Sequence, residues 1–561
     1  MKTHLQDPSF HQQGPILCIL VLAFLIRIVG IHFGLPDLYH ADEPIVVNHA
    51  LAYGTGDLNP HFFKIPPLVS YLLFVVYGLY FLAGALAGSF KTADDFLNLF
   101  LRDPSYFYLL ARIIFGALIG TATVYLLYQL GRKFFSREHG LFSALFLAVC
   151  FLHVRDSHYV YVDIPLLFLL VLAFFPILRI LGRCSQKDYL LFGIIFGIAV
   201  TTKYNGVFLI CPFLVAHLIR RRPINFTFTS FFVSVFIFFI LNPFSVMNLK
   251  FFMKELLTQS QSEGFSGFLH HFNYSLNEGM GAPLFYLSLV GILFGFFSRD
   301  PRRLVFLSFV GVYFIVLAFL SQPYDRYALP LIPLLCFFAS DAFIKIGEKV
   351  KVIQKWLLIF AIMFTIPSIA KIFASDYLFL QKDIRTQARE WIEQRIPANS
   401  KIALDIQFYA PRLKPNLKQI LEKKEEALIA PISNVQRKRL DLLAKHAKAK
   451  AEGRYELFFL ADQPTNERFL FSKPAVPYEL TNLKKLGIHY VVLTQLDLLA
   501  QKDFYDQVAK KGKLIGQFNP YRDNQIVWPV DKLPLTGGPF LWKDLMARKA
   551  NGQLIKIYQL E

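Results

Sequence analysis

The stretch Ile164–Leu181, IPLLFLLVLAFFPILRIL, carries one charged residue, Arg179, in a run otherwise made of apolar residues. A transmembrane helix needs about 20 mostly apolar residues, so this stretch is a candidate membrane span. Comparable segments recur along the chain at 15–35, 106–130, 226–243, 283–298, 303–321, 327–346 and 356–374. Shorter apolar stretches at 141–154, 190–202 and 206–219 are ambiguous by length alone. The pattern predicts a polytopic α-helical membrane protein.

Composition supports the same fold class. Of the 561 residues, 55% are hydrophobic and 18% are charged, whereas a soluble chain is about a quarter charged. A purely soluble enzyme is therefore excluded. The net charge of +19 would suggest nucleic acid in a soluble protein, but cytoplasmic loops and anionic headgroups explain it better in a membrane protein. We expect membrane lipids as partners and no nucleic acid.

The placement of charge decides how the apolar stretch 66–88, which begins with Pro66-Pro67, is interpreted. If this stretch lies at the outer interface, basic loops such as Gly131–His139, Arg220-Arg221-Arg222 and Lys345–Lys355 face the cytoplasm, as the positive-inside bias requires. We therefore predict about eleven spans, with Ile65–Phe90 as a re-entrant or juxtamembrane helix pair. The first apolar segment is too long for a removable signal peptide and lacks a small-residue cleavage site.

The sequence after about Ser375 has a different character, with charge runs such as Glu422–Glu426 and only short apolar stretches. It predicts helices at Lys382–Arg395 and Leu498–Lys511 and buried strands at Lys401–Leu404, Tyr455–Leu460 and His489–Thr494. We expect a transmembrane catalytic domain at 1–375 and a small extracytoplasmic α/β domain at 376–561. The five cysteines form no CxxC pair, which argues against a zinc site or a disulfide framework: Cys18, Cys150, Cys184, Cys211 and Cys336.

The strongest candidate for chemistry is His40-Ala41-Asp42-Glu43, directly after the first span. Ionisable groups near membrane depth are costly and are functional candidates by default. One carboxylate could accept a proton from an attacking hydroxyl or orient it, and the other could hold a neighbouring cation or a metal. The alternative is an interfacial helix start, where acidic residues are common. The convergence of other polar groups on the same face favours function.

Four further polar stretches lie at the same predicted face: Asn59–Pro67, Arg155–Pro165, Thr201–Asn205 and Gln322–Tyr327. Each has a structural alternative, because Lys64 could only snorkel and Asp163 could only cap a helix. Arg112 falls early in the second span, and an arginine in a span usually points into the bundle. Together, Lys64, Arg112, Lys203 and Arg326 indicate a cationic pocket for a phospholipid-like leaving group, facing carboxylates that include a general base.

This ordered set resembles the membrane glycosyltransferases of the GT-C fold. The resemblance rests on His40–Glu43, the Lys64-x-Pro-Pro element, Arg112, Tyr161–Leu166, Lys203-Tyr204 and Arg326-Tyr327-x-Leu-Pro. It is strongest to the dolichyl-phosphate-mannose–protein mannosyltransferases and the bacterial aminoarabinose transferases that modify lipid A, in glycosyltransferase family 39 and relatives. It covers roughly residues 15–400, and its specificity lies in the ordered set rather than in any single motif.

The resemblance implies transfer of a monosaccharide from a polyprenyl-phosphate carrier to a lipid, glycan or protein acceptor, with inversion, at the outer face of the cytoplasmic membrane. It implies a catalytic role for Asp42, Glu43 and Asp163. It implies donor-phosphate binding by Lys64, Arg112, Lys203, Arg326 and Tyr327, and substrate binding by His40, His61, Arg155, Tyr161, Tyr204 and Tyr324. No cofactor is expected, although the sequence leaves open a divalent cation beside Asp42 and Glu43.

Two other classes of protein compete with this hypothesis. A transporter or lipid flippase would also have many spans with intramembrane charges, but we find no inverted repeat, and the polar residues cluster at one face instead of the bilayer midplane. A structural subunit would leave Asp42, Glu43 and the cations unexplained. The segment Phe244–Ala282 could shape an acceptor entrance, although a solvated loop is slightly favoured for it.

Overall fold

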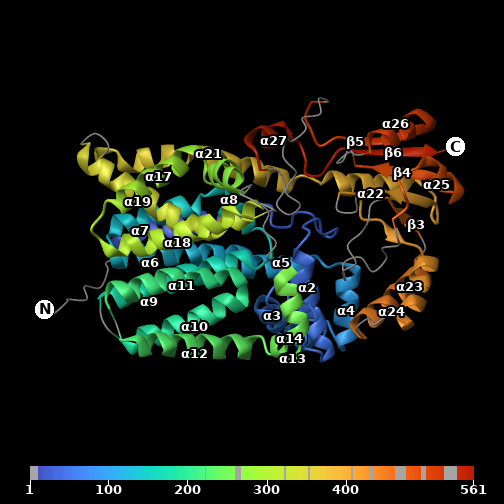
Figure 1. The fold of residues 1–561 in the computed structure, drawn as a ribbon. Helices are drawn as coiled ribbons and strands as arrows, with labels where there is room; N and C mark the ends of the chain where they lie inside the picture. Colours follow the sequence, from blue (N-terminus) through green and yellow to red (C-terminus); the bar gives the residue numbers. More distant parts are fainter. Residues whose placement is uncertain are drawn as a thin grey trace.

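The computed structural model consists of a helical bundle joined to a C-terminal sheet unit (Figure 1). It describes residues 10–182, 185–221, 223–258, 267–320, 324–350, 354–405, 409–429, 434–450, 452–460, 475–494, 501–523 and 540–560. Cys184, Arg222 and the first residues of the predicted helix Leu498–Lys511 lie outside the described residues.

The bundle contains a helix at every position where the sequence predicts a span. These helices are α1 (Phe10–Ile28), α5 (Ser105–Ala111) continuing through the π-helix η2 (Arg112–Leu118) into α6 (Ile119–Phe134), α7 (Arg137–Ala148), α9 (Asp163–Gly182), α10 (Gln186–Thr202), η3 (Tyr204–Leu209) with α11 (Ile210–Ile219), α12 (Ile224–Leu241), α17 (Ala282–Phe296), α18 (Pro301–Ala318), η5 (Asp325–Leu331) with α19 (Ile332–Lys349), and α21 (Leu357–Leu380). Within the described residues, seven helices are long and apolar enough to cross a membrane, or eight if the bent pair Gly267–Met280 and Ala282–Phe296 is one span. The figure of eleven spans stays a prediction.

The bundle contains further helices, most of them short. They are α2 (Glu43–Ala52), η1 (Tyr53–Thr55), α3 (Leu68–Leu86), α4 (Ala93–Arg102), α8 (Phe151–Asp156), α13 (Phe244–Met247), α14 (Leu249–Thr258), α15 (Gly267–Leu269), η4 (His270–Leu276) and α16 (Asn277–Met280). Figure 1 shows α2, α4 and α14 running across the direction of α9 and α12. The segment 65–90 forms the single helix α3 where we expected a helix pair. By length and composition α3 could itself span, so its interfacial position stays a prediction.

Small residues allow the long helices to approach closely. A Cβ on Gly131 of α6 would lie 2.7 Å from the backbone of Gly140 in α7, and a Cβ on Gly291 of α17 would lie 1.9 Å from the Phe338 carbonyl oxygen of α19. Close backbone contact of this kind is how helices associate in lipid, where apolar side chains gain little from leaving the solvent. Close packing of the helix backbones at these glycines therefore stabilises the bundle.

The sheet unit holds six strands in the order β2-β3-β1-β4-β6-β5. The strands are β1 (Lys401–Leu404), β2 (Lys414–Pro415), β3 (Arg454–Phe459), β4 (Tyr490–Leu493), β5 (Gly512–Phe518) and β6 (Ile555–Leu560), and the helices are α22 (Ile384–Arg395), α23 (Leu417–Ile429), α24 (Asn434–Ala449), α25 (Leu480–Lys485), α26 (Lys502–Lys511) and α27 (Trp542–Ala547). Strands β2, β3, β1 and β4 are parallel, and β6 and β5 pair antiparallel at the far edge. The expected α/β fold is found, with β1, β3 and β4 at the predicted positions.

The sheet unit touches the bundle at the loop after α1. The Tyr39 hydroxyl lies 2.8 Å from the Thr386 hydroxyl, the Arg389 Nε lies 3.0 Å from an Asp37 oxygen, and the Arg385 guanidinium stacks on the Tyr39 ring at 3.8 Å. We call this end of the bundle the sheet-side end. The division of the chain near residue 375 stays a proposal, and α21 runs through that position to Leu380.

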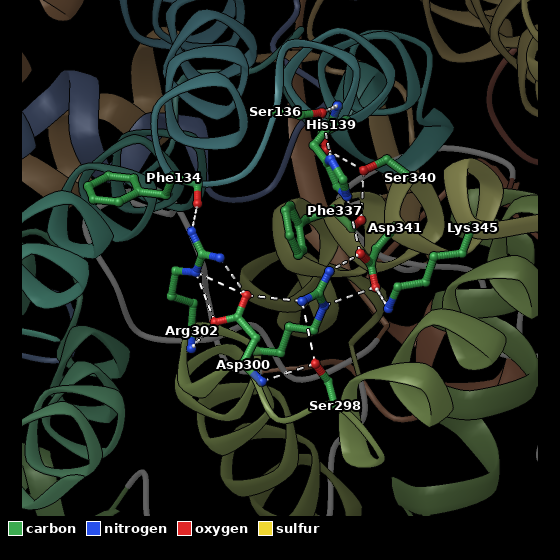
Figure 2. Close-up of polar contacts among 12 residues, drawn as sticks. Phe134, Ser136, His139, Ser298, Asp300, Arg302, Phe337, Ser340, Asp341 and Lys345 are labelled. Carbon is green, nitrogen blue, oxygen red and sulfur yellow. Dashed lines mark hydrogen bonds and ion pairs between the residues drawn. The ribbon is translucent and has the colours of Figure 1, made fainter. Parts of the chain in front are cut away.

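A polar cluster lies near the other end of α19, where α7 and α18 begin (Figure 2). Asp341 accepts hydrogen bonds from His139 at 3.1 Å, from Arg303 at 2.6 and 3.2 Å and from Lys345 at 2.8 Å. Arg303 also donates to Asp300 at 3.0 Å. We call this group the Asp341 cluster; it joins α7, α18 and α19.

Candidate active site

The carboxylate of Asp42 meets the guanidinium of Arg326 at the sheet-side end. Asp42 is the residue before α2, and Arg326 is the second residue of η5. The two side chains form an ion pair in which both are largely shielded from solvent, at 13% and 11% exposure. Residues 284 positions apart in sequence thus become direct partners.

A second ion pair joins Asp163 and Lys203. Asp163 is the first residue of α9, and Lys203 directly follows α10. The Lys203 Nζ lies 2.5 Å from Asp163 Oδ1 and 5.3 Å from the centre of the Tyr327 ring. From its sequence position alone Asp163 could be only a helix cap, but in the structure it pairs with a cation at the end of another helix.

Aromatic rings surround the Arg326 guanidinium. Its central carbon lies 5.0 Å from the Tyr161 ring, 5.3 Å from the Tyr324 ring and 5.9 Å from the Tyr327 ring. Rings at these distances attract a cation through their negative faces, and they exclude water from it. Three tyrosines that the resemblance assigned to substrate or phosphate binding therefore surround Arg326, which it assigned to phosphate binding.

A small cavity opens beside these pairs, lined by His40, Asp156, Tyr159, Tyr161, Asp163, Ile164 and Arg326. Two charged atoms here are buried and have no hydrogen-bond partner in the described part of the chain: Asp163 Oδ2 and Arg326 Nε. The Tyr159 hydroxyl is in the same state. A buried polar atom without a partner costs free energy, so three of them at one cavity indicate a place for a polar ligand.

Glu43 and Arg112 require a correction to the expected roles. Arg112 is fully buried and donates to both Glu43 oxygens, at 2.7 and 2.6 Å, and to the carbonyl oxygens of Ile31 and Phe33. Glu43 also accepts the Val160 backbone N–H at 3.0 Å. A guanidinium occupied in this way does not fit the predicted contact with donor phosphate, and a carboxylate held by it does not fit a catalytic base. The pair instead fixes the start of α2, and hence Asp42, against the 160–163 loop.

Arg155, which was expected to bind substrate, is instead buried and paired with two carboxylates. It is 1% exposed, and it donates to Asp325 at 2.6 Å and to Asp156 at 2.7 and 3.0 Å. Burial raises the pKa of the Asp156 carboxyl to about 6. Asp156 and Asp325 lie within the polar stretches 155–165 and 322–327. Nothing in their sequence positions predicts that they pair with Arg155.

The loop that carries Lys64 is fastened on both sides of Phe63. The Phe63 N–H donates to the Glu255 carboxylate of α14, and its carbonyl accepts the Tyr204 hydroxyl at 2.8 Å. Tyr204 thus holds the loop that presents Lys64 instead of lining the cavity. His61 pairs with Asp57 at 2.9 Å in the same loop, with both side chains more than half exposed, so the structure does not bring His61 to the cavity.

His40 lines the cavity and also supports the first turn of α2. Its Nδ1 accepts the backbone N–H groups of Asp42 and Glu43, each at 3.2 Å. Burial lowers the pKa of His40 to about 4, so the ring is neutral at neutral pH. Because Nδ1 accepts, the ring proton is on Nε2.

The structure also bears on a possible metal site and on the segment Phe244–Ala282. Among the described residues, no three His, Cys, Asp or Glu side chains are grouped so as to hold a metal ion. The described part of Phe244–Ala282 is mostly helical, and its His271 is fully buried, so a solvated loop is wrong for that part.

Part of the chain is similar to one family of known proteins. Residues 107–247 match the family model of dolichyl-phosphate-mannose–protein mannosyltransferases. The chain is 30% identical over 205 residues, 34% of its length, to dolichyl-phosphate-mannose–protein mannosyltransferase 1 of Saccharomyces cerevisiae. The alignment spans 23% of that relative, so the chain matches about a quarter of the curated protein's length.

Two solved structures share the fold. ArnT from Cupriavidus metallidurans bound to undecaprenyl phosphate is similar with a TM-score of 0.51 and 14% identity, over 90% of this chain and 96% of that one. The oligosaccharyltransferase of Archaeoglobus fulgidus in its apo form is similar with a TM-score of 0.50 and 13% identity, over 87% of this chain and 70% of that one. These matches confirm the predicted fold class: the chain is an integral membrane protein with the GT-C fold.

Proposed function

We propose that this chain is a membrane glycosyltransferase that moves a monosaccharide from a polyprenyl-phosphate carrier to an acceptor. The observation that carries the proposal is the cavity lined by Asp163 and Arg326, whose ion-pair partners are Lys203 and Asp42. Asp163 Oδ2 and Arg326 Nε have no hydrogen-bond partner among the described residues. Similarity to a named protein mannosyltransferase and to a fold neighbour bound to undecaprenyl phosphate supports it.

In this proposal the donor phosphate binds the cations that now hold the carboxylates. Arg326 offers its free Nε, Lys203 adds a point charge, and Lys64 approaches from its fastened loop. A phosphate competes with Asp42 for Arg326, so donor binding frees the Asp42 carboxylate. The cations then stabilise the negative charge that develops on the departing polyprenyl phosphate.

The chemical step is a displacement at the anomeric carbon of the sugar. Asp42 takes the proton of the acceptor hydroxyl, whose oxygen forms a bond to the anomeric carbon. The bond from that carbon to the phosphate oxygen breaks, and the electron pair leaves with polyprenyl phosphate. Attack from the side opposite the phosphate inverts the configuration. Glu43, Arg112 and Arg155 position these groups without touching substrate.

We place the reaction at the outer face of the cytoplasmic membrane, with residues 1–375 as the catalytic domain and 376–561 as an extracytoplasmic domain. The positive-inside distribution of basic loops supports this orientation. The acceptor is a lipid, a cell-envelope glycan or a protein. A reporter that is active only outside the cytoplasm should be active when fused in the sheet unit and inactive when fused within Lys345–Lys349.

The function is tested with purified chain in liposomes supplied with undecaprenyl-phosphate-linked sugars and envelope lipid or protein extract. We expect release of undecaprenyl phosphate together with a labelled acceptor, and loss of both in Arg326→Ala. Arg303→Ala in the Asp341 cluster is the matched control and should retain transfer per folded molecule. Movement of the labelled lipid across the bilayer with no glycosidic bond made or broken would refute the enzyme and favour the flippase.

A further inference from the structure

Phe540 belongs by sequence to the sheet unit but lies in the core of the bundle. It precedes α27 and is 1% exposed. Its ring centre lies 5.4 Å from that of Phe151 in α8 and 4.8 Å from that of Tyr274 in η4. A side chain from the C-terminal part of the chain thus fills a gap between helices at the sheet-side end.

Two cations rest against the Phe540 ring. The Arg155 guanidinium carbon lies 4.8 Å from the ring centre, and the Lys371 Nζ lies 5.1 Å from it. Lys371 is also fixed by Glu278, at 2.5 Å. Cation–ring attraction is strongest where water is excluded, and Arg155 and Lys371 are both almost fully buried. The ring therefore restrains the position of Arg155 in addition to its carboxylate partners.

Arg155 connects the Phe540 ring to Arg326 of the candidate site through Asp325. The Arg155 Nη1 donates to Asp325 Oδ2 at 2.6 Å, and the other oxygen of Asp325 accepts the Arg326 backbone N–H at 2.8 Å. Asp325 therefore holds the start of η5 and with it the residue that pairs with Asp42. The contacts run without interruption from Phe540 through Arg155 and Asp325 to Arg326.

We propose that Phe540 is a positioning residue that the sheet unit supplies to the active site. It holds Arg155, which orients Asp325 and so fixes Arg326 for the phosphate of a polyprenyl-phosphate donor. The sheet unit thus completes the phosphate site without touching substrate. This inference rests on the proposed function only where it assigns the phosphate to Arg326; the restraint on η5 stands apart from it.

The experiment compares three substitutions of Phe540 in the full-length protein. Phe540→Tyr keeps the ring, Phe540→Leu keeps most of the apolar volume without a ring, and Phe540→Ala removes both. Phe504→Ala is the control, because Phe504 is buried in the core of the sheet unit beside Tyr478 and Tyr505. The measurements are affinity for undecaprenyl phosphate and the rate of amide hydrogen exchange over 325–331.

We expect the affinity for undecaprenyl phosphate to fall roughly tenfold in Phe540→Leu and Phe540→Ala, with faster exchange over 325–331. Phe540→Tyr should stay within about twofold of the unchanged protein, and Phe504→Ala should alter neither reading. If Phe540→Leu matches the unchanged protein in both readings, the ring has no role and the proposal is overturned. Should Phe540→Ala fail to fold, the Leu and Tyr substitutions still decide between these outcomes.

A further variant separates this inference from the proposed function. If Arg326→Ala binds undecaprenyl phosphate as the unchanged protein does, the phosphate assignment fails. Faster exchange over 325–331 in Phe540→Leu would then still support the restraint on η5. If Arg326→Ala loses binding while Phe540→Leu changes nothing, the function stands and the positioning role is overturned.

Discussion

The two buried ion clusters of the bundle differ in how completely their charges are paired. Asp341 accepts four hydrogen bonds from His139, Arg303 and Lys345, two on each oxygen. At the sheet-side end, Asp163 uses one oxygen and Arg326 has a buried Nε, neither the other oxygen nor this nitrogen having a partner among the described residues. Arg326 and Asp341 lie 15 residues apart in sequence, in η5 and in α19.

Charge at membrane depth therefore does not by itself mark a site. A cluster whose members satisfy one another joins helices, and it needs no ligand. A cluster with buried polar atoms that lack hydrogen-bond partners carries a free-energy penalty, and a ligand in the adjacent cavity can remove this penalty by pairing with them. On this criterion we propose that the sheet-side cluster is functional and that the Asp341 cluster is structural, and the following substitutions test that division.

The largest effect is expected for Asp42→Asn. The amide is similar in size but cannot take a proton, so transfer should fall about 10³-fold with little change in thermal stability. Initial rates of sugar transfer in liposomes and melting in detergent check this expectation. Normal turnover in the variant would remove Asp42 as the base and return the site to the transporter hypothesis.

The matched substitution at the other end is Asp341→Asn. Loss of this carboxylate removes the buried anion that Arg303 and Lys345 pair with, so stability should fall by about 3 kcal/mol. Transfer per folded molecule should not change. The measurement is unfolding in detergent together with the transfer assay; a variant that folds normally but does not transfer would contradict the division between the two clusters.

A smaller effect is expected from His40→Asn as the pH falls. The pKa of His40 is depressed to about 4 in the folded chain, so its contribution to stability is present above the unfolded value near 6.5 and is lost as pH falls toward 4. Between pH 7 and pH 5 the unchanged protein should lose roughly 2 kcal/mol through this group. An asparagine oxygen can still accept the two N–H groups but does not titrate, so the variant's melting should depend less on pH. Parallel pH curves would refute the assignment.

The smallest effect is expected for Lys64→Ala. This lysine is exposed on its loop, so its attraction for phosphate is screened, and affinity for undecaprenyl phosphate should fall roughly fivefold. Tyr204→Phe should have a similar effect, because it releases the carbonyl of Phe63 that steadies the loop. Titration with undecaprenyl phosphate measures both. Unchanged affinity in both would mean that the loop plays no part in donor binding.

Most of the sheet-side site could be predicted from sequence because its residues stand at helix boundaries. Asp42, Asp163, Lys203 and Arg326 each lie at the end of a helix or one residue from it, and a topology that gathers those ends gathers the residues. The different partners of Asp42 and Glu43 could not be predicted. Two adjacent carboxylates give the same sequence signal, and only the direction of the first turn of α2 sends one to Arg326 and the other to Arg112.

Two strands of the sheet unit differ in how clearly the sequence marks them. β5 contains two glycines and is mostly half-exposed at an edge, so no apolar run marks it. β6, IKIYQL, carries the alternation typical of a strand, so its position is predictable from the sequence. Phe540 gave no signal, because a single phenylalanine among 60 reveals nothing of the distant helices that it joins.

Contacts between the described residues join the sheet unit to the bundle at several separate points. Thr386 meets Tyr39, His446 lies 3.3 Å from Asn98 of α4, and Phe540 sits against Arg155. A unit held at several places can turn against its support only if some of these contacts break. We therefore expect the sheet unit to keep its position on the bundle during the proposed reaction instead of swinging like a hinged lid.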